Sequence, residues 1–516
     1  MLLLLWFSVF ILYVVYLFVK KFPVIRRQYR IMEKIPGPPL DNYFLGHSSE
    51  VFRTVETRPA SNLQLHKEYG GIYRQWPGWV PFIILAKAEY AEVFFTSKNL
   101  ETKSFLYDVF HDWLGQGLLT SSGHLWQQRR KLITPAFHFS VLNGLCDTLV
   151  EKGIKTVELL RSQPKDSPVD VYEFMYLVAL DSICEAAMGI KINAMTDPKL
   201  DYIRALTDNT TISIERTFKP WLNHRFFYIT PMGRRLARNL ETIFQLSKMA
   251  ISHSKMTRNP KRKENGDTGF DDIKGKKKLA FLDLLLEAHD STTAFITDEG
   301  LQDEVNTFMF AGHETTASSM SFTLHILSIH PEIQEKCFRE LDDIFQGSDR
   351  KPTVDDLRDM KYLEQVIKES LRLFPSAPQI GRRVSADTQF GKYIAPAGSN
   401  LTLSIYALHR DPEHFPDPEK FDPERFSREN VSIRHPFAYV PFAAGARNCI
   451  GQKFAMMEEK VILSYIIRHF IIEAVTQKDD VKVLFSAVLR SKESIHVIFK
   501  QRKYLNSQLN TFITPD

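Results

Sequence analysis

Cysteine is scarce in this sequence. Its 516 residues include only Cys146, Cys184, Cys337 and Cys449. No two of these have CxxC spacing, and small disulfide-bonded proteins contain cysteine at a far higher density. We therefore interpret Cys146, Cys184 and Cys337 as small buried residues of a domain that folds in a reducing compartment.

An excess of charge of one sign is also missing. The sequence has 66 Lys and Arg residues against 61 Asp and Glu residues, and the net charge of +5 is spread along the chain. A nucleic-acid-binding protein usually concentrates its basic residues on one face, so we expect no nucleic-acid partner. Residues 258–278 form a low-complexity stretch with two basic triplets. We interpret it as a solvated surface loop, with a weak membrane or partner contact as the alternative.

One long hydrophobic run stands at the N-terminus, from Leu2 to Val19. At the rise of an α-helix its eighteen residues span about 27 Å, close to the thickness of the hydrocarbon core. The run has no charged start and no Ala-x-Ala site, which argues against a cleaved signal peptide, and it is not the Arg-rich amphipathic pattern of a mitochondrial presequence. Lys20 and Lys21 follow it, so residues 1–20 are predicted to be an uncleaved transmembrane anchor whose basic side is cytosolic.

The remainder of the chain is predicted to be one domain. Residues 21–40 are basic and proline-rich, and they form a stiff linker. No second linker follows, so residues 41–516 are predicted to fold together. Helix-period apolar positions dominate residues 90–375, and strand-like segments lie before and after them. The expected fold is mainly α with small β-sheets, in a single catalytic domain behind the N-terminal transmembrane helix.

The strongest motif surrounds the fourth cysteine. The segment Pro441-Phe-Ala-Ala-Gly-Ala-Arg-Asn-Cys-Ile-Gly451 fits the pattern F-x-x-G-x-R-x-C-x-G. Five fixed positions would match by chance in about one chain in ten thousand of this length. A helix is predicted to begin at Gly451, so backbone amides at its N-terminus can stabilise a thiolate at Cys449. A buried structural cysteine is the alternative, and the motif disfavours it.

This segment resembles the haem-binding segment of the cytochrome P450 family. The resemblance implies that the Cys449 thiolate ligates a haem iron and donates electron density that favours O–O cleavage. It implies that Phe442 shields the sulfur, that Arg447 pairs with a haem propionate, and that Gly451 lets the backbone pass close to the porphyrin.

A second motif, Ala311-Gly-His-Glu-Thr-Thr316, resembles the oxygen-activation sequence of the same family. Ala311 and Thr315 share one face of a predicted helix, and His313 points away from that face. The resemblance implies that Gly312 leaves room for the haem plane or dioxygen. It also implies that Thr315 donates a hydrogen bond to iron-bound oxygen and that Glu314 relays protons through water.

Two further motifs match the family in order along the chain. Glu369-Ser-Leu-Arg372 would by itself be an ordinary surface pair. With Arg425 in the segment 421–426, the resemblance implies a buried triad of Glu369, Arg372 and Arg425 that supports the haem loop.

The remaining candidates are propionate ligands. The W-x-x-x-R pattern of Trp126 and Arg130 places both residues on one helix face, where the resemblance implies that they donate to a propionate. Arg382 is a further candidate, with its neighbour Arg383 as the alternative in register.

In detail the chain resembles family 4 of the cytochromes P450, whose members commonly hydroxylate fatty acids at or near the terminal carbon. The similar segments are residues 113–119, 134–139, 307–310 and 434–442. Many members of that group carry a glutamate at the position of Ala311, which can form an ester with a haem methyl. Alanine has no carboxylate, so we expect haem b without a covalent link at Ala311. The missing tether also weakens the expectation of strict terminal-carbon selectivity.

The resemblance implies that a hydrophobic substrate, with a fatty acid as the expected one, is hydroxylated with O2, two electrons and two protons. No G-x-G-x-x-G fingerprint follows a predicted strand. We therefore expect electrons from NADPH-cytochrome P450 reductase, with cytochrome b5 as a second candidate donor and Lys453 and Lys460 as candidate docking residues. The expected location is the endoplasmic reticulum membrane, with the catalytic domain in the cytosol.

Two alternatives remain open at this stage. The first is a haem-thiolate isomerase or dehydratase acting on lipid peroxides, which would usually lack the pair Glu314 and Thr315. The second is a non-catalytic membrane haem-binding sensor or carrier, which would need neither residue and would form no NADPH-dependent product.

Overall fold

The computed structural model describes residues 22–41, 46–47, 58–77, 80–197, 200–218, 222, 225–257, 281–291 and 296–502. Within these ranges no helix is both long enough and apolar enough to cross a bilayer. The predicted anchor at residues 1–20 lies outside the described residues, and so does the predicted surface loop at residues 258–278.

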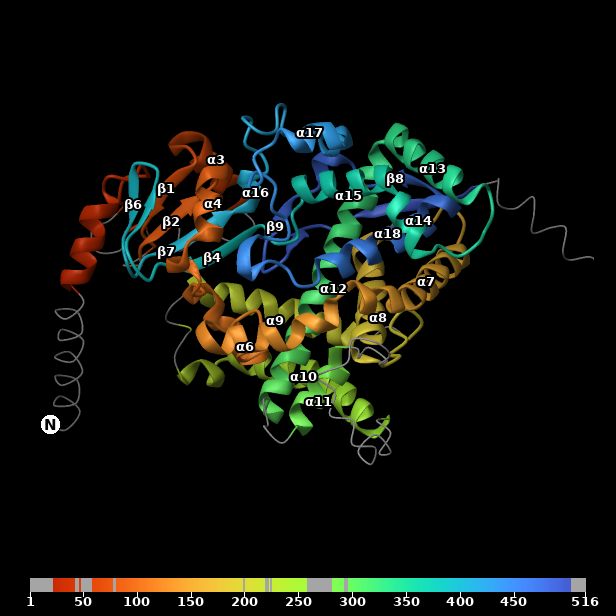
Figure 1. Cartoon of the computed structure of the whole chain (residues 1–516), viewed down its shortest axis with the longest axis horizontal. Helices are drawn as coiled ribbons and strands as arrows, with labels where there is room; N and C mark the ends of the chain where they lie inside the picture. Colours follow the sequence, from red (N-terminus) through yellow and green to blue (C-terminus); the bar gives the residue numbers. More distant parts are fainter. Residues whose placement is uncertain are drawn as a thin grey trace, which may run out of the picture.

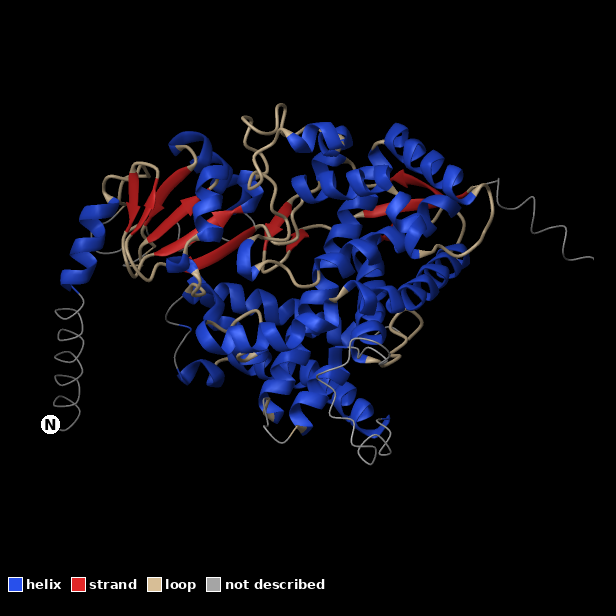
Figure 2. Ribbon diagram, viewed as in Figure 1, coloured by secondary structure: helices blue, strands red, loops and turns tan. Residues whose placement is uncertain are grey.

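Helices make up most of the described chain (Figures 1 and 2). The longer ones are α3 (Arg58–Tyr69), α6 (Gly123–Ile133), α7 (Phe139–Ser162), α8 (Val171–Met188), α9 (Leu200–Phe218), α10 (Pro231–Thr257), α11 (Phe281–Asp290), α12 (Asp298–Ile329), α13 (Pro331–Phe345), α15 (Lys361–Leu373) and α18 (Gln452–His469). The shorter ones are α4 (Ala88–Thr96), α5 (His111–Leu114), α14 (Val354–Asp359), α16 (Ile405–Leu408) and α17 (Arg428–Ser432). Short 3₁₀ turns include η2 (Phe105–Phe110), η3 (Thr134–Phe137), η5 (Arg225–Ile229), η7 (Pro423–Phe426) and η8 (Gly445–Arg447).

The strands form small sheets, as predicted. One sheet of four strands has the order β1 (Ile72–Gln75), β2 (Phe82–Leu85), β7 (Asn400–Ser404), β4 (Gln379–Arg383). The β1–β2 hairpin is antiparallel, β2 and β7 are parallel, and β4 is antiparallel to β7. The other sheets pair β3 (Val169–Asp170) and β8 (Phe470–Ala474) with β11 (His496–Gln501), β5 (Thr388–Phe390) with β6 (Tyr393–Ala395), and β9 (Val483–Phe485) with β10 (Leu489–Ser491).

The four-stranded sheet and the helical bulk occupy different sides of the molecule. The sheet lies with α3 and α4 at the left of Figure 1, whereas α7, α8, α13 and α18 lie at the right. Each part has its own core, because Ile83, Leu85 and Phe94 belong to a buried cluster that is separate from the helical one. The mainly α architecture with small sheets at its margins therefore agrees with the expectation from sequence.

Helix α12 runs through the centre of the helical part (Figure 1) and packs against α8 and α18. It begins where the Thr297 side chain accepts a hydrogen bond from the Gly300 amide, and acidic residues follow in its first turn. Its 32 residues span about 48 Å, and almost every one from Glu304 to Ser328 is buried. The helix is therefore a rigid support for any residue that it presents to a site.

Candidate functional site

The loop that carries Cys449 lies between η8 and α18. Gly445 has φ +68°, and a Cβ atom there would lie 2.4 Å from the Phe95 carbonyl oxygen, so this turn requires glycine. The Cys449 amide donates to the Phe442 carbonyl at 2.8 Å. These contacts close the loop, and α18 begins at Gln452, one residue later than predicted.

The Cys449 sulfur receives hydrogen bonds from the backbone amides of Gly451 and Gln452. Burial raises the pKa of the Cys449 thiol, while these amides and the charge of Arg130 act to lower it. The residue nevertheless keeps accessible surface. A thiol that borders a space between elements can be surrounded by protein atoms and still keep accessible surface, as Cys449 does. Donors aimed at the sulfur suit a thiolate, the form in which cysteine binds iron.

A second partly accessible surface interrupts the buried length of α12. Ala311, Gly312 and Thr315 are only partly buried, whereas His313 and Glu314 are fully enclosed. The Thr315 hydroxyl donates to the Ala311 carbonyl at 2.7 Å. Ala311 and Thr315 therefore share one face of the helix, as predicted, and this face is the partly accessible part of α12.

Gly312 lies where helices α12 and α8 pack closely together. A Cβ atom at this position would lie 2.6 Å from Cγ1 of Ile183 on α8. The close approach of α8 to α12 therefore requires glycine here. The expected room for haem or dioxygen beside Gly312 stays a prediction.

Glu314 points toward α8 and the C-terminal strands. Its Oε1 accepts hydrogen bonds from the Tyr176 hydroxyl on α8 and from the guanidinium of Arg490 on β10. The His313 ring lies with its centroid 4.7 Å from that of Tyr176, and burial lowers the pKa of His313. His313 therefore lies away from the Ala311 and Thr315 face, as predicted.

Three cations converge near the start of the predicted haem loop; Arg382 is buried, and Lys103 and Arg447 are half-buried. Lys103 and Arg382 are joined by a backbone β-bridge, and Arg447 lies close to both. Burial, followed by the charges of Arg382 and Arg447, lowers the pKa of Lys103 far below its ordinary value. Burial, followed by the charge of Arg382, lowers the pKa of Arg447 to about 10.

None of these three cations forms an ion pair with a carboxylate in the described part of the chain. Like charges that are buried without a counter-charge destabilise a fold strongly. The cluster Lys103, Arg382 and Arg447 therefore fits a ligand with two negative charges, such as the paired propionates of haem. Sequence reasoning missed Lys103, because its neighbours Arg382 and Arg447 are distant in the sequence.

The register of β4 decides between the two candidate arginines. Arg382 is buried and Arg383 is exposed. This is expected for consecutive residues of a strand, whose side chains point to opposite faces of the sheet. Arg382 is therefore the residue at the cation cluster, and the alternative in register is not supported.

Trp126 and Arg130 both lie at the Cys449 loop. The guanidinium of Arg447 stacks on the Trp126 ring at 4.2 Å from its centroid. The Arg130 guanidinium donates to the Asn448 carbonyl at 2.8 Å and to its side-chain oxygen at 2.7 Å. Arg130 therefore holds the residue immediately before Cys449, and its expected contact with a propionate stays a prediction.

The predicted triad is present as a buried network. Arg372 donates to both oxygens of Glu369, at 2.7 and 2.9 Å, and the Nε of Arg425 lies 3.5 Å from Glu369 Oε1. Arg372 also donates to the carbonyls of His409, Pro418 and Lys420. Burial raises the pKa of Glu369, and Arg372 opposes that shift. The network ties α15 to the segment that leads into the cysteine loop.

The two candidate docking lysines differ. Lys453 is exposed at the start of α18. The Lys460 ammonium is buried and binds Glu364 Oε2 at 2.5 Å and the Leu357 carbonyl at 2.8 Å. The prediction that Lys460 contributes to a docking face is therefore wrong, because its charge is used inside the fold.

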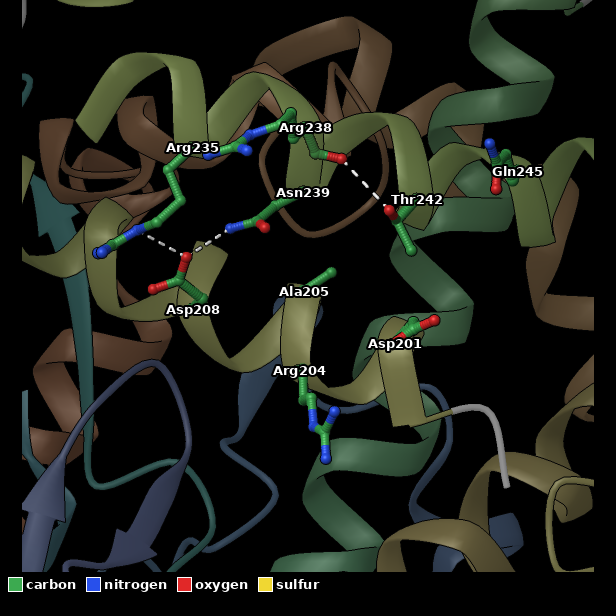
Figure 3. A pocket seen from close by; sticks show the side chains of 9 residues that line it. All are labelled: Asp201, Arg204, Ala205, Asp208, Arg235, Arg238, Asn239, Thr242 and Gln245. Carbon is green, nitrogen blue, oxygen red and sulfur yellow. Dashed lines mark hydrogen bonds and ion pairs between the residues drawn. The ribbon is translucent and has the colours of Figure 1, made fainter. Parts of the chain in front are cut away.

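A groove of about 530 Å³ lies between α9 and α10 (Figure 3). Asp208 there binds Arg235 at 2.9 Å and Asn239 at 2.7 Å. Charged side chains of both signs line the groove, and none of the predicted site residues does.

The sequence model of the cytochrome P450 family matches residues 36–499. The chain is 40% identical to "Cytochrome P450 4c21" of Blattella germanica over 92% of this chain and 94% of that protein. It is 39% identical to "Cytochrome P450 4c3" of Drosophila melanogaster over 91% of this chain and 90% of that protein. It is 41% identical to "Cytochrome P450 4V2" of Homo sapiens over 84% of this chain and 82% of that protein.

The chain belongs to the cytochrome P450 family, whose members are haem-thiolate monooxygenases of the oxidoreductase class. The family implies a haem bound through a cysteine thiolate, together with O2, a redox partner and a hydrophobic substrate. The donors at Cys449 and the unpaired cations Lys103, Arg382 and Arg447 suit that group.

Proposed function

We propose that this protein hydroxylates a medium- or long-chain fatty acid, or a related lipid, at or near its terminal carbon. The proposed electron donor is NADPH-cytochrome P450 reductase, with cytochrome b5 as a second donor. The family-4 relatives support the substrate class. The observation that carries the reaction type is the placement of Thr315 on the open face of α12 with the buried acid Glu314 beside it.

Aromatic rings pack against the turn of α12 that precedes this face, an apolar surrounding that would suit an alkyl chain. Trp113 and Phe310 lie edge to face with ring centroids 4.6 Å apart, and Phe308 stacks on Phe137 at 5.5 Å. Thr307 and Asn306 are also buried, and the Asn306 amide donates to the Trp113 carbonyl at 3.0 Å. An apolar wall with few polar groups favours a hydrophobic substrate held by shape.

The proposed cofactor is haem b without a covalent link to the chain. When bound, haem supplies the iron chemistry that activates dioxygen. Cys449 would hold the iron, and Lys103, Arg382 and Arg447 would bind the propionates. Ala311 offers no carboxylate for an ester.

Thr315 and Glu314 are proposed to manage protons. The Thr315 hydroxyl donates a hydrogen bond to the Ala311 carbonyl. Rotation about χ1 would turn this hydroxyl toward the site. Glu314 Oε2 has no hydrogen-bond partner among the described residues, so this atom can accept or release a proton through water. The pair favours a monooxygenase over a peroxide isomerase or a carrier, neither of which needs delivered protons.

We test this function with purified haem-loaded protein, reductase, NADPH and a panel of saturated and unsaturated fatty acids. Mass spectrometry should find NADPH-dependent products hydroxylated at the terminal carbon or beside it. The matched control is Cys449→His. Conversion of lipid hydroperoxides without reductase would favour the isomerase. Absence of any NADPH-dependent lipid product would contradict the proposal.

We also propose that residues 1–20 anchor the protein in the endoplasmic reticulum membrane with the catalytic domain in the cytosol. The hydrophobic run and the basic residues after it support this topology. In sealed microsomes, added protease should digest the catalytic domain. A protected domain would contradict the topology.

A further inference from the structure

A buried ion pair connects the proposed proton-relay acid to the C-terminal hairpin. The Arg490 guanidinium, on β10, donates through Nη2 to Glu314 Oε1 on α12 and through Nη1 to Thr207 Oγ1 on α9 at 3.0 Å. The Tyr176 hydroxyl on α8 donates to the same Glu314 oxygen. Four elements therefore meet at one carboxylate.

The charges of this pair depend on each other. Burial opposes the charge of Arg490, but Glu314, Tyr172 and Tyr176 outweigh it and raise the pKa of Arg490. Burial and then the charge of Glu314 raise the pKa of Tyr176 far above its ordinary value. Arg490 is the cation paired with Glu314 in the described part of the chain. Without it a carboxylate with no exposed surface would lose its counter-charge.

The other titratable groups that face Glu314 do not replace Arg490. Burial raises the pKa values of Tyr172 and Tyr202, and it lowers that of His313, so all three favour their neutral forms. They can shape the site but cannot balance a carboxylate.

The geometry also fixes which oxygen is free. Both donors, Tyr176 and Arg490, converge on Glu314 Oε1, and Oε2 has no partner within the described residues. Arg490 therefore holds the carboxylate in one orientation and leaves a single atom to exchange a proton with water.

The second arm of Arg490 reaches helix α9. Thr207 is the α9 residue that hydrogen-bonds to Arg490. On the same helix, the Tyr202 ring lies 5.9 Å from that of His313 on α12. A displacement of α9 would therefore stretch the Arg490–Thr207 bond and disturb the guanidinium that orients Glu314.

We propose that Arg490 is a positioning residue for oxygen activation, which holds Glu314 as an oriented carboxylate and couples that orientation to the position of α9 through Thr207. The inference rests on the proposed proton role of Glu314. The first experiment below needs neither turnover nor a substrate, so its failure is distinct from a failure of the proposed function.

The first test is infrared spectroscopy of the haem-loaded, substrate-free protein. In Arg490→Gln the Glu314 carboxylate loses its cation and should take up a proton. The difference spectrum against wild type should show the C=O band of a protonated carboxyl, and the band should vanish in the double variant with Glu314→Gln. Burial raises the pKa values of Glu458 and Glu459 to about 8, so they contribute equally to both spectra and cancel.

Arg490→Lys keeps the charge and should show no new band. A spectrum of Arg490→Gln without the band would overturn the proposal, as would a band that survives in the double variant. The reduced carbon monoxide spectrum of each variant checks that the thiolate-bound haem is intact.

The second test measures coupling, the amount of product formed per NADPH, and the hydrogen peroxide released. Arg490→Gln should lower coupling by about tenfold, with more peroxide and a changed solvent isotope effect. Thr207→Val removes the α9 hydroxyl but leaves the ion pair. Thr207→Val should show no infrared band. Its coupling with a short and with a long fatty acid should be more alike than the two values are in wild type.

If Arg490→Gln does not retain haem, Arg490→Lys and Thr207→Val still decide the matter. Lysine has one nitrogen in place of the two that bind Glu314 and Thr207, so Arg490→Lys should weaken the bond to Thr207 and reproduce the flattened dependence on chain length. Wild-type coupling in both variants would refute the connection to α9.

Discussion

Lys103 and Arg382 are joined by a β-bridge, and the charge of Arg382 helps to lower the pKa of the half-buried Lys103 ammonium. Arg447 adds a third positive charge to the same place. The chain thus keeps together three cations that repel each other. A bound anion would relieve this repulsion, so the cluster indicates the end of the site at which the propionates would lie.

We predict opposite effects of Lys103→Met on the apoprotein and the holoprotein. Removing one of three like charges should stabilise the apoprotein, because repulsion and desolvation are relieved. Loss of a charge-assisted contact should weaken haem binding by roughly tenfold or more, since such contacts contribute about 1.5–3 kcal/mol. Thermal unfolding of the apoprotein and haem transfer to apomyoglobin measure the two effects. The matched control is Lys98→Met at an exposed lysine. A variant that binds haem as tightly as wild type would remove Lys103 from the site.

Arg372→Ala should yield protein without haem. Arg372 has no exposed surface and holds Glu369 together with the carbonyls of His409, Pro418 and Lys420. Its removal leaves the buried Glu369 carboxylate with Arg425, at 3.5 Å, as its remaining cation, and breaking a buried ion pair costs about 3–5 kcal/mol. The ratio of haem to protein absorbance checks this, with the exposed Arg358→Ala as control. A normal haem content in Arg372→Ala would show that the network does not support the cysteine loop.

The buried acids Glu458 and Glu459 on α18 predict a pH dependence of stability. Burial raises the pKa of each from 4.5 to about 8. Between these values the folded state binds protons that the unfolded state does not, so stability falls as pH rises through this window. The total effect is on the order of a few kcal/mol.

The double variant Glu458→Gln, Glu459→Gln stays neutral and should lose less stability than wild type between pH 6 and pH 9. Thermal unfolding of the holoprotein at several pH values measures the difference. Glu287→Gln, at an exposed position, should behave as wild type. Equal slopes for wild type and the double variant would show that the two carboxyls ionise freely in the folded protein.

Local sequence motifs predicted the parts of the site that lie within one short segment. The turn at Gly445 and the helix after Cys449 depend on neighbouring residues, so a pattern of ten positions was sufficient. Glu369 and Arg372 are three residues apart, and an arginine follows them in segment 421–426. Through family resemblance this order likewise indicated the network of Glu369, Arg372 and Arg425.

Contacts between distant segments were beyond sequence reasoning. The neighbours of Lys103, the partner Arg490 of Glu314 and the approach of Ile183 to Gly312 depend on how separate elements pack. The choice between Arg382 and Arg383 depended on the register of β4, in which a shift of one residue exchanges the buried and exposed faces.

Ala311 predicts how firmly the haem is retained. It lies on the partly accessible face of α12 that also carries Thr315, and its methyl group cannot form an ester. Acidic organic solvent should therefore extract all haem from the wild-type protein after turnover. Ala311→Glu places a carboxylate at the position where many family-4 members carry one, so part of its haem should remain on the chain after turnover, as mass spectrometry of the intact protein would show. Ala311→Gln fills the same space without an acid and should release all haem. Retained haem in the wild type would reveal a link through another residue, whereas full release from Ala311→Glu would place position 311 too far from the haem edge to react.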